Sequence, residues 1–367
     1  GRGGIIVRSQ ADLSSPLLSD RLSTGSQVHE LEIRGDRLHY EKLSGTGPES
    51  GWVSVKLEAK NGEVKDLLVK VPQDITVPAN LQPAKKSRAS PEIKAAAWAI
   101  LEADAILVGT GAGMGVDSGL GTFRGRNAGI WPPLQRLGLE FPQVSTPSWF
   151  KRDPHFAWAF WWFRYEGYTS CQPHAGYKLL CDWGRQKRGG FFSFTSNIDG
   201  HWEEVGAPTY ECHGSLRFLQ CTKPCHRDCW PVPADFRLTL QDNRDDRVKD
   251  PLPKCPKCGQ IARPAVLMFG DWGYCSPRDH EQEARFEEFS SRATSGQKLA
   301  VIEVGAGTAV ATVRMTCERE SRSAGATLIR INLEDPHVPP GSIGIKLGAL
   351  DALSQIDAEM RSLRQGG

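Results

Sequence analysis

The chain has 367 residues, with 45 lysines and arginines against 43 aspartates and glutamates. This length suits about two domains, and the near-balanced charge, without a long run of one sign, argues against nucleic acid as a partner. No apolar stretch approaches the roughly 18 residues of a membrane-spanning helix. Ten cysteines are too few for a disulfide scaffold of this size, and we expect a reducing, intracellular compartment.

The first 90 residues divide into three segments by their residue patterns. Residues 1–25 are polar and without periodicity, which predicts a disordered tail. Short alternating runs with turn residues between them predict a small antiparallel β-domain over 26–72, and its segment GTGPESGWVSV is similar to small SH3-like barrels. The prolines of residues 73–91 predict a linker. The partner of the β-domain is left open.

From residue 92 onward, helical patterns alternate with short apolar runs. The runs AILVGTG, GGFFSFTSN, KLAVIEVGAG and ATLIRIN predict a Rossmann-like parallel sheet covered by helices, an α/β fold. Ligands of such sheets bind at the carboxyl ends of the strands. The glycine-rich segment 109–125, TSNIDG and VGAGTA all follow predicted strands, so we expect one ligand site that all three loops form.

The glycine-rich segment matches neither of two common phosphate-binding patterns. Its glycines would allow a phosphate to approach the backbone closely. However, GTGAGMGVDSGLGTFRG contains no G-x-G-x-x-G, and no Gly-Lys-Ser/Thr follows it. By itself the segment therefore fits a flexible surface loop as well as a ligand site.

Two closely spaced cysteine pairs predict a structural zinc site. Cys221 and Cys225 form C-x3-C, and Cys255 and Cys258 form C-x2-C. Four thiolates close a tetrahedral zinc site with no position left for a substrate, which makes it structural. The nearby His226 or Cys229 are alternatives to Cys225 as the second ligand. We expect a small zinc lobe inserted at about 216–262 and a helical insertion near 128–185.

The motifs of this chain resemble those of sirtuins and occur in the same order. They are GAG…SG…FRG at 111–125, SNID at 196–199, HG at 213–214, the four cysteines, RPAVLMFGD at 263–271, VGAGTA at 304–309 and IN at 331–332. The resemblance covers about 92–362, and CHGS…LQC is similar to the bacterial-type branch. It implies removal of acyl groups from protein lysines with NAD as co-substrate, giving nicotinamide, deacylated lysine and O-acyl-ADP-ribose. The implied partner is an acylated-lysine protein or peptide.

The resemblance also implies roles for single residues. His213 would be the general base on the ribose hydroxyls, a task that suits a group titrating near neutrality. Asn197 and Asp199 would hold the nicotinamide amide and the ribose. Val266, Phe269 and Gly270 would receive the acyl-lysine peptide as an added strand. The NAD contacts would be Gly111, Ala112, Gly113, Phe123, Arg124, Ser196, Asn197, Asp199, Gly305, Gly307, Thr308 and Asn332.

The chain departs from the family pattern at several positions. Gly121-Thr122 stand in place of Pro-Asp, which removes a fixed φ and a carboxylate and predicts weaker NAD binding or slower turnover. Ser196 replaces a Gln, and Asp271 replaces a Glu. The alternative function is a weakened sirtuin-fold subunit that binds NAD or another protein.

The choice of acyl group rests on one helical segment. Trp161 and Arg164 stand where sirtuins that prefer acidic acyl groups carry Tyr-x-x-Arg. Arg164 could pair with a succinyl-type carboxylate, although Trp161 lacks the phenol oxygen. The same aromatic stripe is also explained as helix core.

Overall fold

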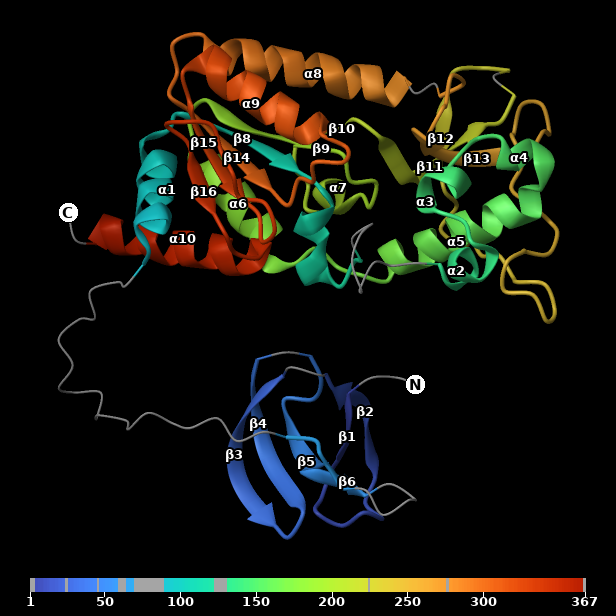
Figure 1. The fold of residues 1–367 in the computed structure, drawn as a ribbon, viewed down its shortest axis with the longest axis vertical. Helices are drawn as coiled ribbons and strands as arrows, with labels where there is room; N and C mark the ends of the chain where they lie inside the picture. Colours follow the sequence, from blue (N-terminus) through green and yellow to red (C-terminus); the bar gives the residue numbers. More distant parts are fainter. Residues whose placement is uncertain are drawn as a thin grey trace. The chain divides into compact units, whose positions relative to one another are not determined.

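The computed structural model consists of two compact units, Gly1–Lys85 and Lys86–Gly367 (Figure 1). Within the part of the chain that the structure describes, no helix is long and apolar enough to cross a membrane. The described residues are 4–23, 26–44, 46–58, 64–68, 89–121, 131–223, 225–274 and 277–365.

The N-terminal unit is an all-β domain. Its five-stranded antiparallel sheet has the order β2-β1-β5-β4-β3, and β6 and β7 form a separate pair. The strands are β1 (Ile5–Arg8), β2 (Leu17–Leu22), β3 (Gln27–Arg34), β4 (Arg37–Ser44), β5 (Ser50–Ser54), β6 (Lys56–Glu58) and β7 (Val64–Asp66).

The prediction of a disordered tail over residues 1–25 was wrong, because β1 and β2 belong to this sheet. Val7 and Leu22 are each 1% exposed and pack with Tyr40 and Val53 in the domain core. The register between β1 and β2 shifts after Ile6. A short strand with an irregular register shows no period of two, so the sequence pattern gave no signal. The Asn61-Gly62 turn, residues 69–72 of the predicted β-domain and residues 73–88 of the predicted linker lie outside the described residues.

The C-terminal unit is built on a six-stranded parallel sheet, as the sequence predicts. Its order is β10-β9-β8-β14-β15-β16. Thr110 at the end of β8 pairs with Thr195 at the end of β9 and with Val304 at the end of β14, so these three strands finish at one edge. The strands are β8 (Ala105–Thr110), β9 (Gly190–Thr195), β10 (Thr209–Glu211), β14 (Leu299–Val304), β15 (Thr327–Ile331) and β16 (Ile343–Ile345).

Helices cover both faces of this sheet (Figure 1). On one face lie α1 (Pro91–Glu102), α6 (Ala175–Arg185) and α10 (Ala349–Gln365), and on the other lie α8 (Pro277–Thr294) and α9 (Thr312–Ala324). Helix α1 begins where the Ser90 hydroxyl accepts from the Ile93 N–H, as an N-cap does. Helix α6 corrects the predicted helical insertion at 128–185, because Tyr177 and Leu180 pack into the sheet core.

Four helices and a three-stranded sheet form a second lobe with its own core. Its helices are α2 (Pro132–Leu137), α3 (Phe141–Val144), α4 (Trp149–Arg152) and α5 (Pro154–Thr169). Its antiparallel sheet has the order β12-β11-β13 and consists of β11 (Gly214–Cys221), β12 (Cys229–Pro231) and β13 (Ala262–Val266). The aromatic stripe of α5 is core, with Trp158 and Trp161 each 1% exposed. Trp158 Nε1 donates to the Ala262 carbonyl at 3.0 Å, which joins the helices to the zinc-lobe sheet.

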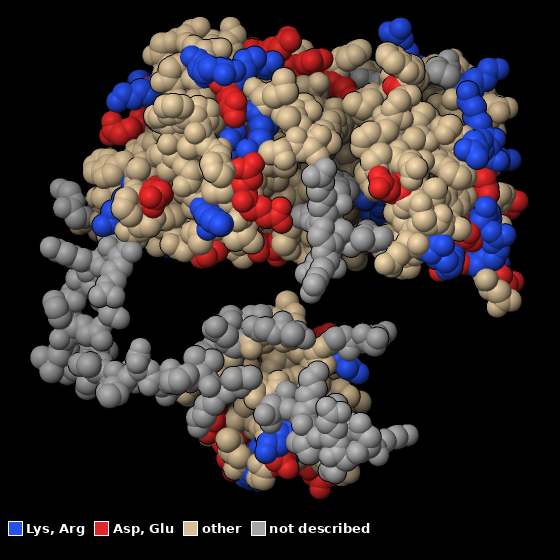
Figure 2. Space-filling model, viewed as in Figure 1, with Lys and Arg blue, Asp and Glu red and all other residues tan. Residues whose placement is uncertain are grey.

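Acidic and basic side chains are interspersed on the surface of the C-terminal unit that Figure 2 shows. On the face seen in Figure 2, acidic side chains lie among the basic ones at both ends of the unit. This agrees with the nearly equal numbers of acidic and basic residues in the chain.

Candidate functional site

The loops after β8 and β14 pack backbone against backbone. Gly111 N donates to the Val304 carbonyl and Gly113 N to the Gly305 carbonyl, each at 3.0 Å. A Cβ on Gly113 would lie 2.7 Å from Gly305 Cα, and Gly305 has φ +64° with its own Cβ position 2.4 Å from Gly113 C. These glycines are therefore required for contact between the two loops. They bring the η1 turn (Ala112–Ser118), with Ala112 half-buried, beside the 305–308 turn.

The loop after β9 is fastened to the same edge by Asn197. Its Nδ2 donates to the Gly111 carbonyl at 3.0 Å, its backbone N–H donates to Thr195 Oγ1, and Ser196 N donates to the Thr110 carbonyl. Asn197 is 9% exposed. One amide N–H of Asn197 is thus used by the fold, and its Oδ1 remains for a ligand.

Asp199 is a buried carboxylate at the start of the short helix α7 (His201–Glu204). It is 5% exposed, and its Oδ1 accepts from the His201 backbone N–H at 2.9 Å. Burial raises the pKa of Asp199, and the neighbouring His201 and Arg217 oppose that rise. A carboxylate in this position can accept from an amide or a hydroxyl group of a bound molecule.

His213 lies half-buried between β10 and β11, next to the loop that carries Asn197. Burial lowers the pKa of His213, while a hydrogen bond with the Ser196 backbone acts in the opposite direction. The His213 carbonyl accepts from Leu267 N at 2.9 Å. A histidine with a lowered pKa is neutral at pH 7 and able to accept a proton.

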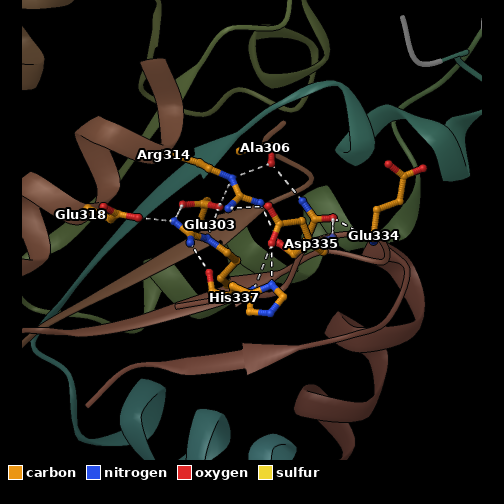
Figure 3. A network of polar contacts seen from close by, with 9 residues as sticks. Glu303, Ala306, Arg314, Glu318, Glu334, Asp335 and His337 are labelled. Atoms are coloured by element: carbon orange, nitrogen blue, oxygen red, sulfur yellow. Dashed lines mark hydrogen bonds and ion pairs between the residues drawn. The ribbon is translucent and has the colours of Figure 1, made fainter. Parts of the chain in front are cut away.

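A buried network of hydrogen bonds and ion pairs supports the 305–308 turn from the side of the sheet (Figure 3). The Ala306 carbonyl accepts from Arg314 Nε at 3.1 Å and from Asn332 Nδ2 at 2.9 Å. Glu303 and Arg330, paired across β14 and β15, form an ion pair at 2.6 Å and are 0% and 2% exposed. Gly307 and Thr308 stay exposed above this network. Asn332 is thus a support of the turn, with its amide already engaged.

The four predicted zinc ligands lie together. The ligand atoms of Cys221, Cys225, Cys255 and Cys258 are all within 4.8 Å of one another, and three of the sulfur pairs are 3.5–3.7 Å apart. A tetrahedral zinc with Zn–S bonds of about 2.3 Å places its sulfurs about 3.8 Å apart. The donor set therefore fits a structural zinc ion.

The residues left open as alternatives to Cys225 occupy two different places. His226 Nε2 lies 3.3 Å from Cys255 Sγ, at the margin of the cluster. Cys229 belongs to β12, opposite Gln220, and among the described residues it is not part of the cluster. The geometry favours Cys225 as the second ligand.

Comparison with known proteins gives one consistent family. The Sir2 family model matches residues 111–284. A curated relative from Thermococcus kodakarensis, named NAD-dependent protein deacylase, is 33% identical over 181 residues, which span 48% of this chain and 62% of that protein. Another of that name, from Pyrococcus abyssi, is 28% identical over 70% of this chain and 93% of that protein. The chain belongs to the Sir2 family.

Solved Sir2 structures agree with the fold of the C-terminal unit. One Sir2 enzyme is 27% identical, with a TM-score of 0.54 over 74% of this chain and 98% of that chain. A Sir2 homologue in complex with NAD shares the fold at 24% identity and a TM-score of 0.56, over 73% of this chain and 93% of that chain. The sirtuin resemblance drawn from the motifs is thereby confirmed at the level of the family.

The predicted peptide edge of this Sir2 chain has fewer free donors than a bare strand. The N–H groups of Leu267, Met268 and Phe269 donate to His213 O, Asp271 Oδ2 and Ser145 O. Val266 is buried in β13, whereas Phe269 and Gly270 are exposed. An added strand would therefore pair from Gly270 onward or through the carbonyls of the edge.

The first and last residues of the RPAVLMFGD motif brace this edge as a pair, which the motif did not indicate. Arg263 and Asp271 form an ion pair with side chains 4% and 0% exposed, and Arg263 also donates to the Val266 carbonyl. Asp271 Oδ1 accepts from Gly273 N, so both neighbours of the 99% exposed Trp272 are held in place. The sequence placed both residues in one motif, and the structure shows that they form an ion pair.

Arg164 is buried, and its partner is a tyrosine one turn further along α5. Its guanidinium donates to the Tyr168 hydroxyl and lies over the rings of Phe141 and Tyr168, 5.0 and 4.9 Å from their centroids. Burial lowers the pKa of Arg164, and it raises the pKa of Tyr168, to which Asp199 contributes. Trp161 has no phenol, but Tyr168 places one beside Arg164, at the i,i+4 spacing that could have indicated the pair.

Some predicted NAD contacts are not placed. Phe123 and Arg124 lie outside the described residues. The same holds for Thr122, the second residue of the Gly121-Thr122 departure.

Proposed function

We propose that this Sir2 chain is an NAD-dependent protein-lysine deacylase that transfers the acyl group to ADP-ribose and releases nicotinamide. The observation that carries the proposal is the junction of three loops from the ends of β8, β9 and β14, with His213 next to Ser196. Polar groups and exposed backbone from three strand ends meet at one edge, where parallel sheets bind nucleotides. Relatives of this chain are named for the same activity.

Each residue has a defined task in the proposed reaction. The acyl oxygen of the substrate lysine displaces nicotinamide at the ribose carbon, and neutral His213 accepts the proton of a ribose hydroxyl. The Asn197 amide oxygen and the Asp199 carboxylate receive the carboxamide and order the ribose. Ala112, Gly113, Gly307 and Thr308 flank the phosphates, and Asn332 supports the turn near the adenine ribose. Phe123 and Arg124 are proposed to close over the ribose.

The structural zinc site would stabilise the second lobe. Its four thiolates leave no open position, so a zinc ion bound there supplies folding energy and no catalytic step. The substrates are proposed to be acylated-lysine proteins, which would bind between the two lobes of this unit at Phe269 and Gly270.

The decisive experiment is nicotinamide release from NAD with an acetyl-lysine peptide, using the full chain with its zinc content measured. We expect release that depends on the peptide and is lost in His213→Ala. Absence of release from zinc-loaded protein that still shows an NAD-dependent rise in melting temperature would overturn the enzymatic proposal. It would support the alternative, a binding subunit weakened at Gly121-Thr122.

We also propose that Arg164 favours acidic acyl groups. The observation that supports this is the buried guanidinium, held by Tyr168 and stacked on Phe141. A cation enclosed by aromatic rings gains more from a carboxylate than from an apolar acyl chain.

A further inference from the structure

Two buried histidines flank Tyr177 of α6, and they differ in their hydrogen bonds. His174 Nε2 lies 2.8 Å from the Met114 carbonyl, and its Nδ1 accepts from Gly176 N at 3.0 Å. His201 is 0% exposed, yet within the described ranges neither of its ring nitrogens has a hydrogen-bond partner. The Tyr177 ring centroid is 5.0 Å from that of His174 and 5.5 Å from that of His201.

The Tyr177 hydroxyl has the same property as the His201 ring. Tyr177 is 0% exposed, and its oxygen has no hydrogen-bond partner among the described residues. Asp199 belongs to the same loop as His201, and its Oδ1 accepts from the His201 backbone N–H at 2.9 Å. Burial and then the charge of Asp199 raise the pKa of Tyr177 well above its ordinary value. Tyr177 and His201, whose rings are in contact, thus each carry a buried polar group without a partner among the described residues, next to the loop that holds Asp199.

Unpartnered buried groups of this kind indicate an occupant. Native proteins pair nearly all their buried polar atoms, with protein groups or with enclosed water. Because Tyr177 and His201 are both fully buried, such an occupant is enclosed by protein, and water is the usual partner of enclosed polar groups. A buried water needs two to four polar partners, and Tyr177, His201 and Asp199 supply three.

We propose that Tyr177 and His201 hold an enclosed water that donates a hydrogen bond to Asp199 and so fixes this carboxylate for NAD. The water accepts from the Tyr177 hydroxyl and donates its second proton to one His201 nitrogen. Tyr177 and His201 are then positioning residues, because they act on the substrate through Asp199. The inference rests on the proposed function only for the role of Asp199 toward NAD.

The first test is thermal unfolding of the full chain without NAD. Tyr177→Phe removes one oxygen and keeps the ring. If the hydroxyl binds water, its loss leaves that water without a donor, and we expect the melting temperature to fall by about 2–4 °C. If the hydroxyl has no partner of any kind, its removal leaves the melting temperature unchanged or higher, which would overturn the proposal. His201→Leu is expected to lower it as well, for the same reason.

The second test separates positioning from general stability. We expect Tyr177→Phe to raise the KM for NAD about 5-fold with little change in the peptide KM. Tyr210→Phe is the matched control, because the Tyr210 hydroxyl forms a hydrogen bond with the Glu283 side chain and its ring packs on the opposite face of the sheet. It should lower the melting temperature and leave the KM for NAD unchanged. An equal change of KM in both variants would contradict a role through Asp199.

A crystal structure of the unliganded protein gives the direct readout. We expect ordered water within hydrogen-bond distance of both the Tyr177 oxygen and a His201 nitrogen, and its absence would overturn the proposal. If the wild-type chain does not turn over NAD, the proposed function fails, while the melting temperatures and the water density still decide the inference.

Discussion

At the scale of single residues, burial sets the chemistry of the site. His213 is half-buried beside the Ser196 backbone, and this burial lowers its pKa. Asp199 is more deeply buried, and its pKa is raised. The pKa values of His213 and Asp199 are therefore shifted toward each other, as is common where a base and an acid share one site.

The His213 pKa gives a pH prediction. The proposed role of His213 as a base requires a neutral imidazole, and a pKa below the ordinary 6.5 keeps it neutral to lower pH. We expect kcat/KM to be flat above pH 6.5 and to fall on the acid side, with a midpoint below 6.5. His213→Ala should reduce deacylation about 10²- to 10⁴-fold. His280→Ala, an exposed histidine of α8, is the control, and an unchanged profile in His213→Ala would contradict the assignment.

The Arg164–Tyr168 pair predicts the acyl preference. Arg164→Met should lower kcat/KM for succinyl-lysine about 10- to 100-fold and for acetyl-lysine less than about 3-fold, because only the first loses a charge-assisted bond. Tyr168→Phe should give a smaller change of the same kind. Arg247→Met controls for lost packing, since Arg247 lies over Phe156 in the same core. Equal losses on both acyl groups would refute the preference.

At the scale of elements, the site is a product of loop packing at one sheet edge. The loop after β8 and the loop after β14 approach closely because Gly111, Gly113 and Gly305 lack a Cβ. The network of Glu303 and Arg330 supports the second loop from within the sheet. The glycine-rich segment is thus explained first by contact with its neighbouring loop and only then by a ligand.

The contrast between two glycines of one turn tests this explanation. Gly305→Ala should lower the free energy of unfolding by about 3 kcal/mol, because the new Cβ meets the Gly113 backbone at a positive φ. Gly307→Ala should change it by less than about 0.5 kcal/mol, since no atom of the described residues lies within 4 Å of a Cβ at that position. Urea denaturation measures both. Similar losses in the two variants would show that the loops do not pack as described.

At the scale of the whole molecule, the chain joins an all-β unit to a two-lobed Sir2 unit. The helical insertion and the zinc-lobe sheet share one core, in which Trp158 of α5 donates to the Ala262 carbonyl of β13. A change at the cysteines should therefore spread to the lobe that holds Arg164 and the proposed peptide edge.

Zinc content tests this organisation. Cys225→Ser should lower bound zinc from about one per chain to near zero and lower the melting temperature, because four ligands become three. Cys229→Ser should keep its zinc, since Cys229 lies outside the cluster. Elemental analysis of purified protein and thermal unfolding are the measurements. Zinc loss in Cys229→Ser but not in Cys225→Ser would reverse the ligand assignment.

The sequence by itself determined the family, the parallel sheet and the four cysteines. These features can be recognised in short stretches of the sequence. An apolar run predicts a strand, the spacing of a C-x2-C pair indicates metal ligands, and the order of the motifs is visible without a structure. The β1 and β2 strands were missed because Val7 and Leu22 become core only through pairing with distant strands.

The tertiary structure alone decided which groups meet. The position of Arg164 over Phe141, Cys225 rather than Cys229 at the metal cluster, and the contact of Tyr177 with His201 all depend on how separate elements pack. Hydrogen bonds and burial act over a few ångströms in space, whatever the distance along the chain, so a motif can supply the residues of a site but not the contacts that give them their pKa values and partners.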